Sequence, residues 1–200
     1  MENFLTVSYS INSYNSDADS PEFYIQEISG ELFLENSEGD KKEKIGQILG
    51  KKINLENSIR FGFDVFELWD SQASHVFTIG DAIFDFKTKG FKATVQKKIN
   101  NDAFMFNVLL VERIEIFEPF RGAEHGKYLL KNFFHNFIDS CALMVLKSFP
   151  LQLERLEVEI DKEEEIKQKQ SLLNYYLKMG FIPVSKKHGN ILLFDAVKTF

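Results

Sequence analysis

The segment from Phe104 to Phe117 constrains the fold more than any other part of the chain. Apolar residues occupy one parity at Phe104, Phe106, Val108, Leu110, Ile114 and Ile116, and the other at Met105, Leu109, Val111 and Phe117. A strand that is apolar on both sides is typical of a sheet with a layer packed on each face. The pattern therefore predicts a long central strand in a layered α/β or α+β fold.

Three polar residues, Glu112, Arg113 and Glu115, interrupt this apolar run. Polar groups on a buried strand must be hydrogen-bonded, paired with a charge or placed at an open cleft. Strict alternation puts Glu112 and Glu115 on opposite faces, so at most one of them can reach a given site. Either carboxylate can also be a strand-surface charge paired with Arg113 or another neighbour.

The residues after this strand predict a regular succession of elements. Apolar residues at helical spacing indicate an amphipathic helix over Gly126–Asp139, and Ala142–Leu146 has the length of a strand. A charged helix then ends at Gly180, and a terminal hairpin pairs Phe181–Val184 with Ile191–Val197. The sheet is expected to be mixed, mostly antiparallel and flanked by helices.

The N-terminal half is less regular. We expect strands over Phe4–Tyr9, Glu22–Leu34 and Lys44–Leu55, with the last two joined at the turn Glu38-Gly39-Asp40. One or two helices should follow between Phe63 and Phe86, divided at Gly80, and Lys87–Asn101 reads as a connection or a short solvated helix.

Composition narrows the class of protein. The 200 residues are 44% apolar and 27% charged, which predicts one globular domain over residues 1–200. The net charge of −6 disfavours sequence-independent nucleic-acid binding. A lone Cys141, a start without a secretory signal and the lack of about 18 continuous apolar residues lead us to expect a cytoplasmic protein outside membranes.

The turn between the long strand and its helix is suited to a phosphate. Gly122 and Gly126 permit close approach of the main chain, the helix N-terminus offers free N–H groups, and Arg121 and Lys127 add positive charge. The same glycines can also serve only a tight turn. The glycine spacing fits neither the dinucleotide fingerprint nor the P-loop, since Tyr128 follows Lys127. This lack of fit disfavours NAD and ATP sites.

Two segments resemble the GNAT superfamily of acyl-CoA-dependent N-acyltransferases. Residues 114–130, IEIFEPFRGAEHGKYLL, resemble its strand, [QR]-x-x-G-x-[GA] turn and helix, and residues 175–181, YYLKMGF, resemble its later helix with a Tyr four residues before Gly-Phe. The resemblance covers about Phe104–Val197, and it implies a single domain with a divergent N-terminal half, 1–103, and an acyl-CoA-binding and C-terminal half, 104–197. It implies a GNAT-like sheet and acetyl-CoA as co-substrate.

The resemblance also implies roles for individual residues. Main-chain groups of Ile114 and Ile116 would pair with the pantetheine arm, and Tyr176 would act as general acid at the sulfur. A general base would be Glu112 or Glu115. The pyrophosphate would bind the amides of Arg121, Gly122, Ala123, Glu124, His125, Gly126 and Lys127.

The chain departs from the family pattern at two motif positions. Glu124 replaces the middle glycine, where a carboxylate would face a pyrophosphate of like charge, and Lys169 stands where an Asn is frequent. No metal site is expected, because the four histidines have no ligand spacing among themselves or with Cys141. We expect His125 to cap the turn and Cys141 to be a buried thiol.

These observations predict an N-acetyltransferase in which a primary amine attacks acetyl-CoA directly. The expected acceptor is a small-molecule or peptide amine, with neither nucleic acid nor membrane as a partner, and the edge of the terminal hairpin could pair with a second copy in a homodimer. One alternative is a non-catalytic acyl-CoA-binding or protein-interaction module. Another is an α/β enzyme whose turn holds a different phosphate.

Overall fold

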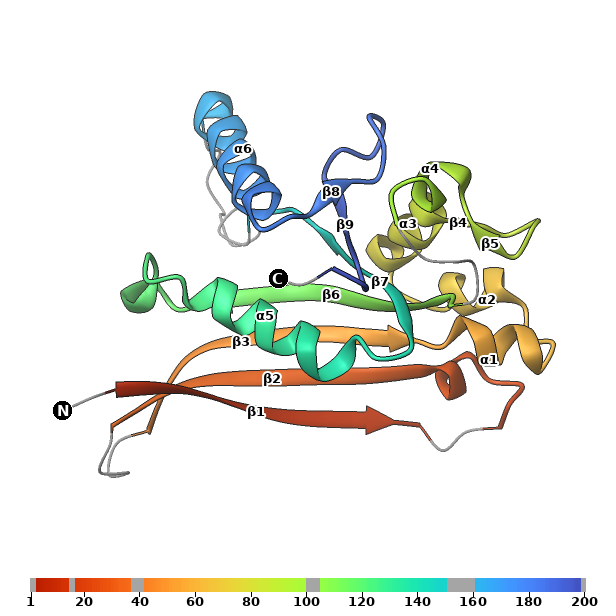
Figure 1. Ribbon diagram of the computed structural model, residues 1–200, viewed down its shortest axis with the longest axis horizontal. Coiled ribbons are helices and arrows are strands. Elements are labelled where there is room, and N and C mark those ends of the chain that lie inside the picture. Colours follow the sequence, from red (N-terminus) through yellow and green to blue (C-terminus); the bar gives the residue numbers. More distant parts are fainter. Residues whose placement is uncertain (1–2, 15–16, 37–41, 100–104, 151–160, 199–200) are drawn as a thin grey trace.

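The computed structural model describes residues 3–14, 17–36, 42–99, 105–150 and 161–198. Its main sheet has seven strands in the order β1-β2-β3-β6-β7-β9-β8, and every neighbouring pair is antiparallel except β6 with β7 (Figure 1). The expected fold class, a mixed and mostly antiparallel sheet flanked by helices, is confirmed.

Three long strands form the N-terminal edge of the sheet. They are β1 (Asn3–Ser13), β2 (Ile25–Asn36) and β3 (Lys42–Ile53). The second begins later than expected because Pro21–Tyr24 form the 3-10 turn η1, and the third ends earlier because Asn54 caps a helix through a 3.2 Å bond from the Asn57 N–H. The turn predicted at Glu38-Gly39-Asp40 lies outside the described residues.

Short helices follow on one face of the sheet. They are α1 (Leu55–Arg60), α2 (Val65–Asp70) and α3 (Ser74–Ile83), and then come the small hairpin β4 (Phe84–Asp85) with β5 (Gly90–Phe91) and the helix α4 (Ala93–Gln96). The prediction that Gly80 divides two helices is wrong. Gly80 lies within α3, where an added Cβ would be 2.4 Å from Trp69 Cδ2, so its role is close helix packing.

The C-terminal half follows the predicted order of elements. It contains β6 (Asn107–Ile116), the 3-10 turn η2 (Glu118–Phe120), α5 (His125–Phe137), β7 (Cys141–Lys147), α6 (Lys162–Lys178), β8 (Ile182–Pro183) and β9 (Ile191–Asp195). Phe104, expected to start the long strand, lies outside the described residues.

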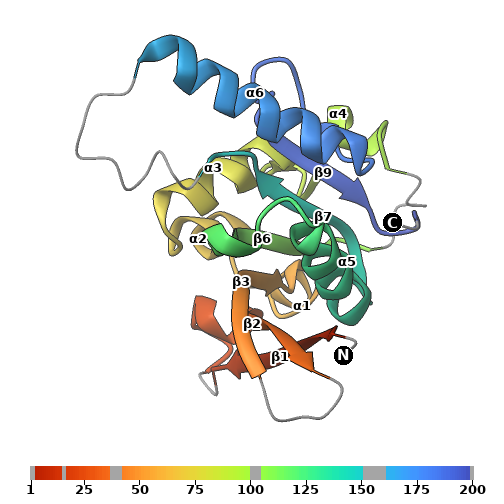
Figure 2. The ribbon, with the colours of Figure 1, turned by 90° about the vertical axis from the view of Figure 1, so that its left-hand side faces the viewer.

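The core has two parts, one on each face of the sheet. Val108 and Leu110 of β6 pack with residues of α1–α4, whereas Leu109 and Val111 pack with α5 and with Tyr176 of α6. Figure 2 shows β6 and β7 between these layers. The strand is thus covered on both faces, as its apolar pattern predicted, and each fully buried Val or Leu contributes about 1.5–3 kcal/mol.

We expect Gly80→Ala to lower the free energy of unfolding by about 1–2 kcal/mol. Overpacking against Trp69 costs about 1–3 kcal/mol, which exceeds the gain of about 1 kcal/mol that Ala brings to a helix. Urea denaturation measures the change. Gly189→Ala is the matched control, because the nearest atom to its Cβ is 3.8 Å away. A Gly80→Ala protein as stable as the wild type would contradict this packing.

Candidate functional site

The ladder between β6 and β7 ends before β6 does. The last parallel pair is Val111 with Leu146, whereas β6 continues to pair with β3 as far as Ile116 and Gly46. Within the described ranges, β6 therefore has no strand partner on its β7 side from Glu112 onward. The two central strands part at this point and leave a gap in the sheet.

The main chain of β6 directs specific groups into this gap. The Phe117 N–H donates to Ile45 O at 2.9 Å, so the main-chain N–H and C=O groups of Phe117 point toward β3. In an antiparallel ladder the direction of the main-chain groups alternates from one residue to the next. The main-chain groups of Glu115 and Arg113 therefore also point toward β3, whereas those of Ile114 and Ile116 point away from it. Consistent with this, the Ile116 carbonyl accepts a 3.0 Å hydrogen bond from Arg121 Nε.

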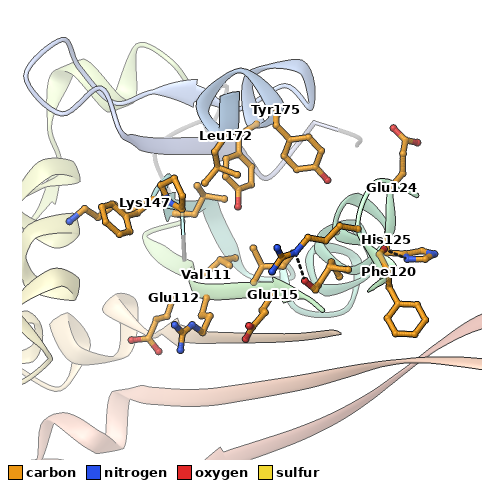
Figure 3. A pocket seen from close by; sticks show the side chains of 18 of the residues that line it. Val111, Glu112, Glu115, Phe120, Glu124, His125, Lys147, Leu172 and Tyr175 are labelled. Atoms are coloured by element: carbon orange, nitrogen blue, oxygen red, sulfur yellow. Dashed lines mark hydrogen bonds between the residues drawn. The ribbon is translucent and has the colours of Figure 1, made fainter. Parts of the chain in front are cut away.

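A cavity of about 320 Å³ occupies the gap (Figure 3). It brings together nearly all of the residues that the sequence singled out. Its lining includes Glu112, Ile114, Glu115, Ile116, Arg121, Gly122, Glu124, His125, Gly126 and Tyr176. Ala123 and Lys127, also singled out, are not part of the lining. Leu146, Phe149, Leu172 and Tyr175 line the cavity too, and motif spacing had pointed to none of these four.

The turn before α5 has an unusual backbone. Gly122 has φ +88° and Glu124 has φ +56°, so two residues of the turn are left-handed. The first main-chain bond of α5 runs from the Tyr128 N–H to Glu124 O, and the N–H groups of the preceding residues have no carbonyl partner within the helix. The predicted cap is present, because His125 Nδ1 donates to Phe120 O at 2.9 Å.

Glu124 contributes to the cavity lining, but its carboxylate is turned outward. Its side chain is 73% exposed and one carboxylate oxygen lies 3.3 Å from Lys127 Nζ. In Figure 3 the carboxylate points away from the labelled residues on β6. The residue at the motif's glycine position therefore accepts a left-handed backbone while its charge turns outward.

Glu112 and Glu115 share one face of β6, contrary to the expectation from strict alternation. Leu49 pairs with Arg113 and Gly50 pairs with Val111, so Glu112 is an extra residue, a β-bulge, in β6. Beyond the bulge, Ile114 and Ile116 continue the α5-side face of Leu109 and Val111. Both carboxylates consequently lie on the opposite face.

The surroundings of the two carboxylates differ. Glu112 Oε1 lies 3.5 Å from His75 Nε2 and 3.8 Å from Lys51 Nζ, and its side chain is 20% exposed. Glu115 is buried, and Oε2 accepts a 3.2 Å hydrogen bond from Gln47 Nε2. Glu112 is thus the more open of the two, and it lies where β6 and β7 part.

Tyr176 lines the cavity and is almost fully buried. It is only 5% exposed and its ring packs against Phe181 at 5.7 Å. Burial raises the pKa of Tyr176 above its usual value of 10, so the phenol is protonated at neutral pH. It can therefore donate a proton but cannot act as a base there.

Cys141 is buried on β7, and burial raises the pKa of its thiol to about 12. A thiol in this environment is a poor nucleophile. In the part of the chain that the structure describes, no group of three or more His, Cys, Asp or Glu side chains could hold a metal ion. No described helix is long and apolar enough to cross a membrane.

Comparisons with known proteins report fold similarity without close sequence relatives. No family model and no curated protein matches the chain. A KacTA–DNA complex matches at 10% identity and TM-score 0.47, covering 96% of this chain and 94% of that one. AtaTR bound with AcCoA matches at 10% and TM-score 0.45, covering 96% and 94%. The loading GNATL domain of CurA from Lyngbya majuscula matches at 9% and TM-score 0.34, covering 83% and 76%.

These are similarities in fold at 10% identity or less, and one of the matching structures is a GNATL domain. Acetyl-CoA, the co-substrate that the resemblance implied, is present in the AtaTR structure.

The predicted set of partners, a small-molecule or peptide amine without nucleic acid, is contradicted. KacTA is found in complex with DNA, and AtaT, at 9% identity and TM-score 0.40 over 95% of each chain, is complexed with acetyl-methionyl-tRNAfMet. The physical error was to exclude nucleic acid from a net charge. Net charge sums the whole surface, whereas recognition depends on local charge and shape.

We expect Glu124→Gly to raise the free energy of unfolding by about 0.5–1 kcal/mol. A left-handed backbone costs a non-glycine residue about 1–2 kcal/mol, and part of that gain is offset by the chain entropy of glycine. Urea denaturation measures the change. Glu124→Ala, which loses the same surface ion pair but keeps a Cβ, should bring no gain, and equal effects of the two substitutions would contradict the assignment to backbone strain.

Proposed function

We propose that this chain binds acetyl-CoA in the gap between β6 and β7 and transfers the acetyl group to an amine. The observation that carries the proposal is the unpaired edge of β6 at Ile114 and Ile116. This edge, the turn before α5 and Tyr176 all border one cavity. A thioester carrier with an extended amide arm and a diphosphate has the shape and chemistry for this cavity.

The pantetheine arm would pair with β6 as a short strand does. Its amides offer donors and acceptors in a line, and the Ile114 and Ile116 main-chain groups turn away from β3 toward it. Each hydrogen bond of this kind contributes about 0.5–1.5 kcal/mol. Arg121 Nε, which donates to Ile116 O in the ligand-free chain, would be replaced there by an arm N–H.

The diphosphate would bind at the turn and the first residues of α5. Free N–H groups and the positive end of the helix dipole favour an anion at this position. We assign this role to the main chain of Arg121, Gly122, Ala123, Glu124, His125, Gly126 and Lys127. The guanidinium of Arg121, released from Ile116 O, would add a positive charge beside the phosphates.

The reaction would be direct attack of a neutral amine on the thioester carbon. The C–N bond forms, the C–S bond breaks, and the thiolate takes a proton from the Tyr176 hydroxyl. A carboxylate accepts the proton that the amine loses, and we favour Glu112 over Glu115 because it is more open and lies at the bulge where the strands part.

A second candidate function is a non-catalytic acyl-CoA-binding or interaction module. The specific observation in its favour is the 5% exposure of Tyr176, which leaves its hydroxyl little access from solvent. Such a protein would bind the carrier without turning it over.

Acetyl-CoA should raise the melting temperature of the protein, since a ligand that binds only the folded state stabilises it. Thiol release should follow when an amine acceptor is added, with charged tRNA and protein extracts among the acceptors. Thermal shift together with a thiol-reactive dye measures both effects. A shift without release would favour the non-catalytic module. The absence of both effects would refute both functions.

Tyr176→Phe should lower kcat by about 10²–10⁴-fold and leave the Kd for CoA unchanged, because it removes one proton donor and keeps the ring. Since burial raises the pKa of Tyr176, the phenol of the wild-type protein should stay protonated, and so remain able to act as the acid, beyond pH 10. Tyr128→Phe is the matched control, because Tyr128 is exposed and donates to Leu5 O away from the cavity. Full activity of Tyr176→Phe would exclude its role as acid.

A further inference from the structure

Two consecutive tyrosines of α6 lie in different surroundings. Tyr176 packs into the core against Phe181, whereas Tyr175 is only partly buried and borders both the main cavity and a shallower one beside it. Figure 3 shows Tyr175 above the turn that leads into α5. Motif spacing points to Tyr176 alone, so Tyr175 has no role in the proposed reaction as described above.

The hydroxyl of Tyr175 contacts the N-terminus of α5. Its oxygen lies 3.3 Å from the position that a Cβ on Gly126 would take, and it borders the main cavity. The hydroxyl is therefore beside the first turn of α5, where the main-chain N–H groups have no carbonyl partner within the helix. In the described ranges, its own proton has no hydrogen-bond acceptor.

The position of the hydroxyl allows it to donate to an anion at this turn. A phenol can donate its O–H hydrogen bond while it is protonated. Burial raises the pKa of Tyr175, and the nearby carboxylate of Glu124 raises it further. The group is therefore a neutral O–H donor at neutral pH, next to the turn where the diphosphate is proposed to bind.

We propose that the Tyr175 hydroxyl binds the diphosphate directly by donating a hydrogen bond to a phosphate oxygen. This inference rests on the proposed function, because it presumes a diphosphate at the turn. It makes Tyr175 a binding residue that distinguishes carriers with a diphosphate from carriers without one. It also ties the nucleotide end of the ligand to α6, the helix that carries Tyr176.

The test compares Tyr175→Phe with the wild type against two thioesters. Acetyl-CoA has the diphosphate, and acetyl-pantetheine has the same thioester and arm without it. We expect the Kd for acetyl-CoA, measured by calorimetry, to rise roughly tenfold, as for loss of a hydrogen bond to a charged group. The Kd for acetyl-pantetheine, measured by NMR titration, should stay unchanged.

The substitution keeps the aromatic ring, so the edge contact between the Tyr175 and Tyr176 rings at 5.6 Å is retained. Tyr128→Phe serves again as control, because it removes one hydroxyl from α5 outside the cavity and should alter neither Kd. Equal weakening for both thioesters, or no weakening for either, would overturn the inference. If the wild type fails to bind acetyl-CoA at all, the proposed function itself falls, and the inference falls with it.

Discussion

The β-bulge at Glu112 is the constraint on which the candidate site depends. One extra residue in β6 ends its alignment with β7 at Val111 and Leu146, while pairing with β3 continues to Ile116. Main-chain groups left without a partner are costly when buried, at about 1–3 kcal/mol each. A strand edge that opens onto a cavity instead leaves them available to water or to a ligand that pairs as a strand does. The same bulge moves Glu112 and Glu115 onto one face, so the departure from regular geometry provides both the slot and the two carboxylates beside it.

The turn before α5 adds a second departure from regular geometry. Gly122 takes a left-handed backbone without strain, whereas Glu124 takes it with a Cβ present and so carries a cost of about 1–2 kcal/mol. Strain of this kind persists only where the surrounding contacts enforce it. Here the His125 bond to Phe120 O and the start of α5 fix the turn from both sides. The Glu124 carboxylate is turned outward toward Lys127 Nζ, 3.3 Å away, although it still raises the pKa of the nearby Tyr175.

Sequence patterns predicted the regular elements well and the irregular ones poorly. The spacing of apolar residues matches a regular element in three places: the apolar run of β6, the stripe of α5 and the terminal hairpin. The existence and order of these elements were therefore correctly predicted. The shared face of Glu112 and Glu115 was missed because a bulge shifts alternation by one residue and leaves no signature in an apolar strand. Gly80 was misread because glycine marks close packing as well as helix ends, and only the position of Trp69 distinguishes the two. The exclusion of nucleic acid failed for a different reason, since a chain-wide charge contains no information about one surface.

Tyr175 illustrates why neighbouring residues in a motif need separate physical arguments. On a helix, consecutive side chains point about 100° apart, so Tyr176 can enter the core while Tyr175 reaches the N-terminus of α5. The phenol of Tyr175 lies beside Gly126 at the first turn of α5 and borders the cavity. The main-chain N–H groups of this turn and the phenol O–H are all donors, so both would favour an anion at the same place. The helix that carries Tyr176 therefore also brings a second donor to the turn where the diphosphate is proposed to bind.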